Sequence, residues 1–259
     1  MAAVRGSDRV SVKTKEQYVY GIVPASAKAP SGTGIARRRL HTVRTHEAAA
    51  IVSDVPEGEL AVGREDLMVH ARVLERALQD GVVLPMRFGV VMSDERAVRE
   101  QLLEGFHRDL VAQLEELDGK VELHLRAVYD EEAVMREILE ANPEIARRRA
   151  ALQGQPADAT YFERIDLGQL VAEAVERARD VDTAAILGEL EPLSVAIDVG
   201  SPDHERVVAR MSFLVERDRL ASFDQAVDEL GRRNEGRLQF KYTGPLPAYS
   251  FVDLPGQGE

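Results

Sequence analysis

The chain has 259 residues, of which 33 are Lys or Arg and 45 are Asp or Glu, so its formal net charge is −12. An acidic balance of this size argues against nonspecific binding to DNA or RNA, which needs a basic surface. Cysteine is absent, which excludes disulfides, thiolate metal sites and cysteine nucleophiles and fits a cytosolic protein. No apolar run approaches the ~20 residues of a membrane-spanning helix, which argues against a membrane protein.

The length favours two domains of roughly 100–150 residues each. Residues 1–16 are polar, mixed in charge and without the apolar core of a signal peptide, and we expect them to form a disordered tail. A helical pattern that ends near Gly119 divides the remaining chain. We therefore predict an N-terminal α+β domain over residues 17–118 and a C-terminal domain over residues 119–259.

The N-terminal domain is predicted to combine strands with two helical stretches. Aromatic, β-branched and other apolar runs predict strands over residues 17–23, 37–45, 48–53 and 82–92. Helical spacing predicts a helix from residue 64 to 81, with a buried face made of Leu67, Ala71, Leu74 and Leu78. A second helical pattern runs from residue 94 to 119, and Gly105 within it leaves either one kinked helix or two short ones.

The C-terminal domain follows the order β-α-β-β-α-β, with additional helices in its first crossover. Alternating apolar residues predict strands over residues 121–127, 193–199, 207–215 and 238–242. Helices are predicted over residues 131–142, 143–152 and 222–230, from Thr160 onward, and from an Asp182 cap to just before Pro192. The expected fold class is α+β with two domains, the C-terminal one ferredoxin-like (βαββαβ) with about three inserted helices.

The usual motifs of catalysis and cofactor binding are missing from the sequence. It has neither a GxxxxGK[ST] phosphate loop nor a GxSxG elbow. Its six histidines lack the spacing of a local metal site. Paired carboxylates such as Glu115–Glu116 lie near predicted helix ends, where solvation and the helix dipole account for them. We therefore expect no catalytic residue, no cofactor and no metal, and a protein that is not an enzyme.

Three segments resemble the signatures of the gas vesicle protein F/L family, in their order and spacing. They are YVYGIV at Tyr18–Val23, His70 with VVLPMRFG at Val82–Gly89, and Phe213–Val215 and Phe223 followed by FKYTGPLPAYSFV at Phe240–Val252. The resemblance implies a minor shell component or assembly factor of gas vesicles, cytoplasmic and vesicle-associated, with neither catalysis nor a cofactor. It also implies two α+β domains and, as partners, the small apolar main shell protein and other accessory vesicle proteins. F-type and L-type members are not distinguished.

On this interpretation, the chain holds the apolar face of a shell subunit before assembly, and its charge keeps the complex dispersed. The candidate partner-binding residues are Arg87, Phe88, Tyr249 and Phe251. The candidate structural or domain-junction residues are His70, Pro85, Gly89, Gly244 and Pro245. One alternative is a small-ligand-binding or enzymatic ferredoxin-like domain that uses a cleft around His70 and Arg87. Another is a regulatory binding module with no role in vesicles.

Overall fold

The computed structural model describes residues 15–55 and 63–254. Within these ranges, no helix is both long and apolar enough to cross a membrane. The tail predicted over residues 1–16 lies outside the described residues except for Lys15 and Glu16. The chain divides into two compact units, the first formed by Met1–Gly119 with Pro247–Glu259 and the second by Lys120–Leu246.

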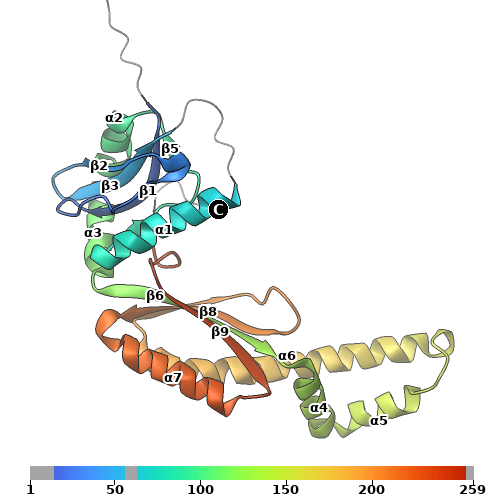
Figure 1. The fold of residues 1–259 in the computed structure, drawn as a ribbon. Coiled ribbons are helices and arrows are strands. Elements are labelled where there is room, and N and C mark those ends of the chain that lie inside the picture. Colours follow the sequence, from blue (N-terminus) through green and yellow to red (C-terminus); the bar gives the residue numbers. More distant parts are fainter. Residues whose placement is uncertain (1–14, 56–62, 255–259) are drawn as a thin grey trace, which may run out of the picture. The chain divides into compact units, whose positions relative to one another are not determined.

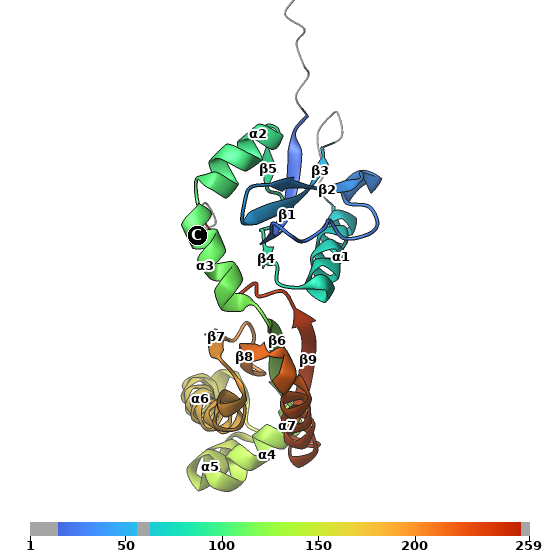
Figure 2. The same cartoon turned by 90° about the vertical axis from the view of Figure 1, so that its left-hand side faces the viewer.

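The first unit is built on an antiparallel sheet with the order β2-β3-β1-β4, in which β5 also pairs with β1 (Figure 1 and Figure 2). Its strands are β1 (Gln17–Pro24), β2 (Leu40–Arg44), β3 (Ala48–Asp54), β4 (Leu84–Pro85) and β5 (Val91–Met92). Nearly every residue of β1 and β3 is buried, as their continuous apolar sequence requires. The strand predicted over residues 82–92 is therefore two short pieces, β4 and β5, on the same neighbour.

The helices of this unit are α1 (Arg64–Asp80), α2 (Glu95–Ala97), a π-helical stretch (Val98–Glu104) and α3 (His107–Leu117). The predicted helix from residue 94 to 119 thus breaks near Gly105, where an added Cβ would collide with the carbonyl oxygen of Gln101. The predicted buried face of α1 is correct for Leu74 and Leu78 but wrong for Leu67, which is about half exposed. Helical spacing places Leu67 on that side of α1, but Leu67 precedes the buried residues of the helix, which begin at His70.

The second unit contains an antiparallel sheet with the order β7-β8-β6-β9. Its strands are β6 (Lys120–Tyr129), β7 (Ala196–Gly200), β8 (Val207–Glu216) and β9 (Leu238–Leu246). The register pairs Leu123 with Phe213 and Leu125 with Met211, so these apolar side chains share one face. His124, Arg126 and other polar residues occupy the opposite face.

Helices α6 (Tyr161–Leu190) and α7 (Leu220–Arg233) cover the apolar face of this sheet (Figure 2). Helices α4 (Glu131–Ala141) and α5 (Pro143–Leu152) lie with the N-terminal half of α6 beyond one end of the sheet (Figure 1). The separate helix predicted from Asp182 is wrong, because α6 continues through that residue for 30 residues in total. Asp182 instead accepts hydrogen bonds from Tyr129 and Arg237, a tertiary role that resembles a helix cap in sequence.

The observed element order of the second unit is β-α-β-β-α-β, with α4, α5 and α6 all in the first crossover. This is the predicted order, and it supports the ferredoxin-like assignment, which stays a prediction. The division of the chain differs from the prediction at its end. The segment from Pro247 onward belongs to the first unit, although it follows the last strand of the second. Sequence continuity alone had placed it in the C-terminal domain.

Candidate functional site

A hollow of about 520 Å³ lies in the first unit, between α1, the segment after β4 and the C-terminal segment. Its wall includes His70 from α1, Arg87 and Phe88 from the segment after β4, and Tyr249. These residues come from three stretches that are far apart in the sequence. Two of the three segments that carry the family resemblance therefore meet at one surface, and His70 lies at its base.

His70 is buried and links α1 to two other parts of the unit. One ring nitrogen, Nε2, lies 3.0 Å from the carbonyl oxygen of Met86, and the other, Nδ1, lies 3.0 Å from the hydroxyl of Tyr18. A carbonyl oxygen only accepts hydrogen bonds, so Nε2 carries the proton and Tyr18 donates to Nδ1. The Tyr18 oxygen in turn accepts a hydrogen bond from the Gly89 amide at 2.9 Å. His70 and Gly89 are thus tied through Tyr18 to the core of this unit, and Pro85 lies in β4 opposite Gly21.

Burial is the main reason why the pKa of His70 falls from 6.5 to about 4, and the hydrogen bond to Met86 only partly opposes it. Burial also raises the pKa of Tyr18 above its ordinary value. Both groups are therefore neutral at physiological pH. With both ring nitrogens engaged, His70 offers neither a free lone pair nor a free proton to a ligand in this arrangement.

The depressed pKa of His70 predicts a loss of stability in acid. The unfolded chain binds the proton below about pH 6.5, whereas the folded chain resists it until about pH 4. The contribution is therefore complete above pH 6.5 and is lost as the pH falls through this window, by about 1.4 kcal/mol per pH unit. Urea unfolding at pH 7, 6, 5 and 4.5 measures the slope. A His70→Gln variant should lose less stability than the wild type between pH 7 and pH 4.5, because it has no imidazole to protonate. Equal slopes for the two proteins would show that His70 is not the cause of the loss.

Aromatic rings surround His70 on several sides. Tyr20 stacks on it with ring centroids 5.6 Å apart, and Phe88 meets it edge-on at 5.7 Å. Tyr20 is itself fixed, because its hydroxyl group shares a hydrogen bond with the Ser53 hydroxyl and accepts one from the Ile35 amide. Phe88 is only half-buried, so one part of its ring completes this cluster and another faces the hollow. Arg87 is exposed beside it.

The C-terminal segment is held against the rest of the first unit by two hydrogen bonds from one side chain of α3. The Gln113 side chain donates to the carbonyl oxygen of Asp253 at 2.8 Å and accepts from its amide at 2.8 Å. Leu254 is buried, whereas Tyr249 is 41% exposed. These two hydrogen bonds keep Tyr249, Val252 and Asp253 along the hollow. Gln113 and Asp253 carried no recognisable signal in the sequence, because neither belongs to a known motif.

Three of the predicted site residues lie elsewhere. Phe251 is half-buried and is not among the described residues that line the hollow. Gly244 and Pro245 belong to β9 in the second unit and are joined by a cis peptide bond. Gly244 has φ of 150°, and an added Cβ would lie 2.6 Å from a methyl group of Leu123. Its role is therefore close packing against β6.

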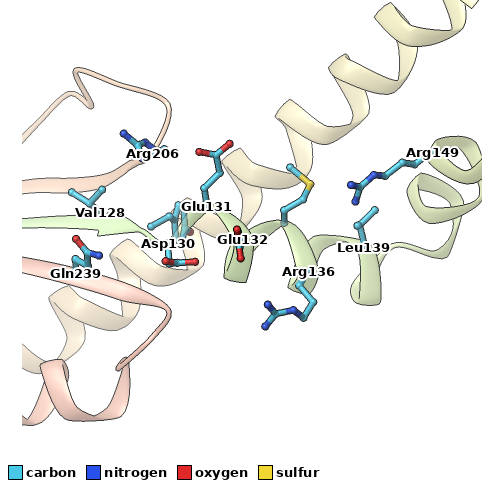
Figure 3. Close-up of a pocket in the computed structure, with 11 residues that line it drawn as sticks. Val128, Asp130, Glu131, Glu132, Arg136, Leu139, Arg149, Arg206 and Gln239 are labelled. Atoms are coloured by element: carbon cyan, nitrogen blue, oxygen red, sulfur yellow. The ribbon is translucent and has the colours of Figure 1, made fainter. Parts of the chain in front are cut away.

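A second hollow of about 870 Å³ lies in the second unit, at the start of α4 (Figure 3). Its charged side chains are spread along α4 and its neighbours and do not converge on one point (Figure 3). Asp130 uses its carboxylate to cap α4 by accepting from the Ala133 amide. No group of three or more His, Asp or Glu residues suited to a metal occurs within the described ranges. We therefore take the hollow at His70 as the candidate site.

Comparisons with known proteins agree on one family. A family model described as gas vesicle synthesis protein GvpL/GvpF matches residues 16–253. Gas vesicle protein F of Streptomyces sp. (strain CB03234) is 37% identical over 91% of this chain and 99% of its own. Gas vesicle protein L of the same strain is 26% identical over 92% of this chain and 93% of its own.

Solved structures show the same fold. The crystal structure of GvpF from Anabaena sp. PCC7120 matches with a TM-score of 0.82 at 22% identity, over 93% of this chain and 99% of that one. The crystal structure of GvpF from Microcystis aeruginosa matches with a TM-score of 0.77 at 24% identity, over 93% of this chain and all of that one. The fold of this chain therefore recurs in both structures.

Proposed function

The chain belongs to the gas vesicle synthesis protein GvpL/GvpF family, and from this we propose that it binds the small, apolar main shell protein of gas vesicles. It acts as a minor structural component or assembly factor that supports nucleation or growth of the shell. Its place is the cytoplasm, in association with the vesicle, and other accessory vesicle proteins are further partners. The greater identity to the F protein than to the L protein of one Streptomyces strain supports an F-type role.

The hollow at His70 is the observation that carries this proposal. Its rim exposes apolar side chains, with Leu67 48% exposed and Tyr249 41% exposed. Beneath them, His70 and the aromatic cluster are fixed by hydrogen bonds, so the surface is formed before a partner arrives. Exposed apolar residues gathered over a rigid base are typical of a protein-binding surface.

The net charge supports the same role. A shell subunit has an apolar face that favours aggregation before assembly. A carrier with a formal net charge of −12 keeps such a complex dispersed by mutual repulsion. Arg87 adds one positive group beside the apolar rim, where it is placed to bind an acidic or carbonyl group at the edge of the bound subunit.

We expect that replacing Arg87 by alanine and Tyr249 by serine together reduces binding of the main shell protein by at least ~10-fold, because both side chains are exposed at the rim. The wild-type chain, co-expressed with the shell protein, should co-purify with it as a dispersed complex, and the double variant should not. The thermal midpoint should change by less than about 2 °C, since neither residue is part of the buried cluster.

A matched control replaces Arg39 by alanine and Tyr161 by serine. Both are exposed, and Tyr161 lies on α6 in the other unit. This control should bind as the wild type does. If the shell protein aggregates whether or not the wild-type chain is present, the carrier role is wrong. If the rim variant loses binding only together with a large fall in the midpoint, the two residues are structural.

One observation favours the alternative of a ligand-binding or enzymatic domain. The hollow is lined by His70, Arg87 and Asp253, which is the combination such a site needs. Against catalysis stands the use of both His70 nitrogens in hydrogen bonds within the fold. A screen of small anionic metabolites by thermal shift separates the two functions. Stabilisation that is lost in Arg87→Ala would favour the ligand-binding alternative.

A further inference from the structure

The two edges of the sheet in the second unit differ in how they are protected. Exposed edge strands are normally guarded by Lys, Pro or a bulge, which block pairing with another chain. The β9 edge has all three, namely Lys241, Pro245 and a shift of register opposite Glu122 and His124. The β7 edge has no Lys, Pro or shift of register within Ala196–Gly200, and its one charged side chain is the exposed Asp198. In the part of the chain that the structure describes, no strand pairs with the outer side of β7.

The outer edge of β7 also exposes β-branched side chains. Ile197 is paired with Phe213 and Val199 with Met211, so both side chains lie on the helix-covered, apolar face of the sheet. Val195 precedes β7, and its amide donates at 2.7 Å to the carbonyl oxygen of Leu214, the residue that also pairs with Ala196. Val195 remains 52% exposed and Val199 49% exposed. The apolar face therefore reaches the outer edge at Ile197 and Val199, and about half of Val199 is left exposed by the described residues.

The sequence Val195–Val199, VAIDV, is suited to pairing with itself. In an antiparallel pair centred on Ile197, Val195 lies opposite Val199 of the second copy, and Ile197 lies opposite Ile197 of the second copy. The acidic Asp198 lies opposite Ala196, so the register places no like charges directly across from each other. Such a pair obeys two-fold symmetry, in which the same residues meet from both sides.

We propose that β7 is a self-association edge through which two copies of this chain join their sheets into one continuous antiparallel sheet of eight strands. This inference does not depend on binding of the shell protein, because it concerns the second unit and a second copy of the same chain. The paired edge is only five residues long, so the dimer is weak and forms at high local concentration.

Sedimentation equilibrium of the full chain tests this proposal. In about 0.3 M NaCl, which screens the repulsion between two acidic chains, the mean mass should rise with concentration from 28.6 kDa toward twice that value. The double variant Val195→Lys/Val199→Lys should raise the dissociation constant at least ~10-fold, because each Lys would face a Lys. In Val195→Lys/Val199→Glu, each Lys faces a Glu, so this variant should dimerise at least ~10-fold more tightly than the double-lysine variant.

The matched control is Val181→Lys on α6, since Val181 is 70% exposed and lies outside the edge; it should dimerise as the wild type does. A chain that stays monomeric up to about 300 µM would overturn the proposal, as would equal dissociation constants for the two charged double variants. Because the chain has no cysteine, Ile197→Cys gives an independent measurement. It should form a disulfide between copies under mild oxidation, and Val181→Cys should not.

Discussion

Replacing His70 by alanine should lower the free energy of unfolding of the first unit by about 3–5 kcal/mol. The variant removes a ring that is 3% exposed and packed against Tyr20 and Phe88, and so leaves a cavity. It also removes the hydrogen-bond partners of the Tyr18 hydroxyl and the Met86 carbonyl. The cavity and the two broken hydrogen bonds each lower the free energy of unfolding.

Hydrogen exchange locates the effect within the chain. Amides of β1 and α1 should lose protection in His70→Ala, while those of β6 and β8 in the second unit should keep theirs. His46→Ala is the matched control, since His46 is exposed, and it should change the free energy by less than about 0.5 kcal/mol. If His70→Ala behaved like this control, His70 would not be the structural link that its contacts indicate.

Replacing Arg237 by methionine should lower the free energy of unfolding of the second unit by about 2–4 kcal/mol. Arg237 precedes β9 and binds Asp182 of α6 through two parallel hydrogen bonds of 2.9 Å, and its Nε binds Glu137 of α4 at 2.8 Å. Its guanidinium also lies over the Tyr129 ring, 5.8 Å from the centroid. One side chain therefore connects two helices to the sheet.

The surroundings of Arg237 explain the expected size of the effect. The hydrogen bonds to Asp182 raise the pKa of Arg237 above its ordinary value, although burial opposes this. Asp182 is 13% exposed, so removal of its partner leaves a largely buried carboxylate. Arg237→Lys keeps the positive charge but not the planar guanidinium group that makes two parallel hydrogen bonds. Its free energy of unfolding should therefore lie between those of the wild type and Arg237→Met.

Arg232→Met is the control for Arg237. Arg232 pairs with Glu229 within α7, and both side chains are exposed, so its loss should change the free energy by less than about 0.5 kcal/mol. Urea unfolding followed by hydrogen exchange in α4, α6 and β9 measures both variants. Equal effects for the two arginines would show that the contacts of Arg237 add nothing beyond a surface ion pair.

Local patterns were enough to predict most elements, and the failures have a common cause. Alternation along β6 and β8 and helical spacing along α7 reflect contacts that one element makes with a single core. Asp182 was misread because a carboxylate that binds an arginine from another strand has the same sequence appearance as a helix cap. Leu67 was misread because spacing gives the side of a helix, but not how far along its length the packing extends.

The candidate site could be identified only by combining the sequence with the tertiary structure. His70, Arg87, Phe88 and Tyr249 were selected from the sequence through the family resemblance, and the structure places all four at one hollow. Gln113 and Asp253, which hold the C-terminal segment there, were missed, because their partnership spans 140 positions in the chain. Phe251 and Gly244 share a segment with Tyr249, yet they do not join the site.

The sequence by itself determined the acidic charge, the absence of cysteine, the periods of the helices and strands, and the segments that mark the family. These are properties of composition or of neighbours along the chain, and they need no folded partner to be read. Only the tertiary structure decided which buried histidine links three elements, which unit holds the C-terminal segment and which sheet edge is left unguarded. Those outcomes arise from contacts between distant residues, and a local pattern does not specify which distant residues will meet.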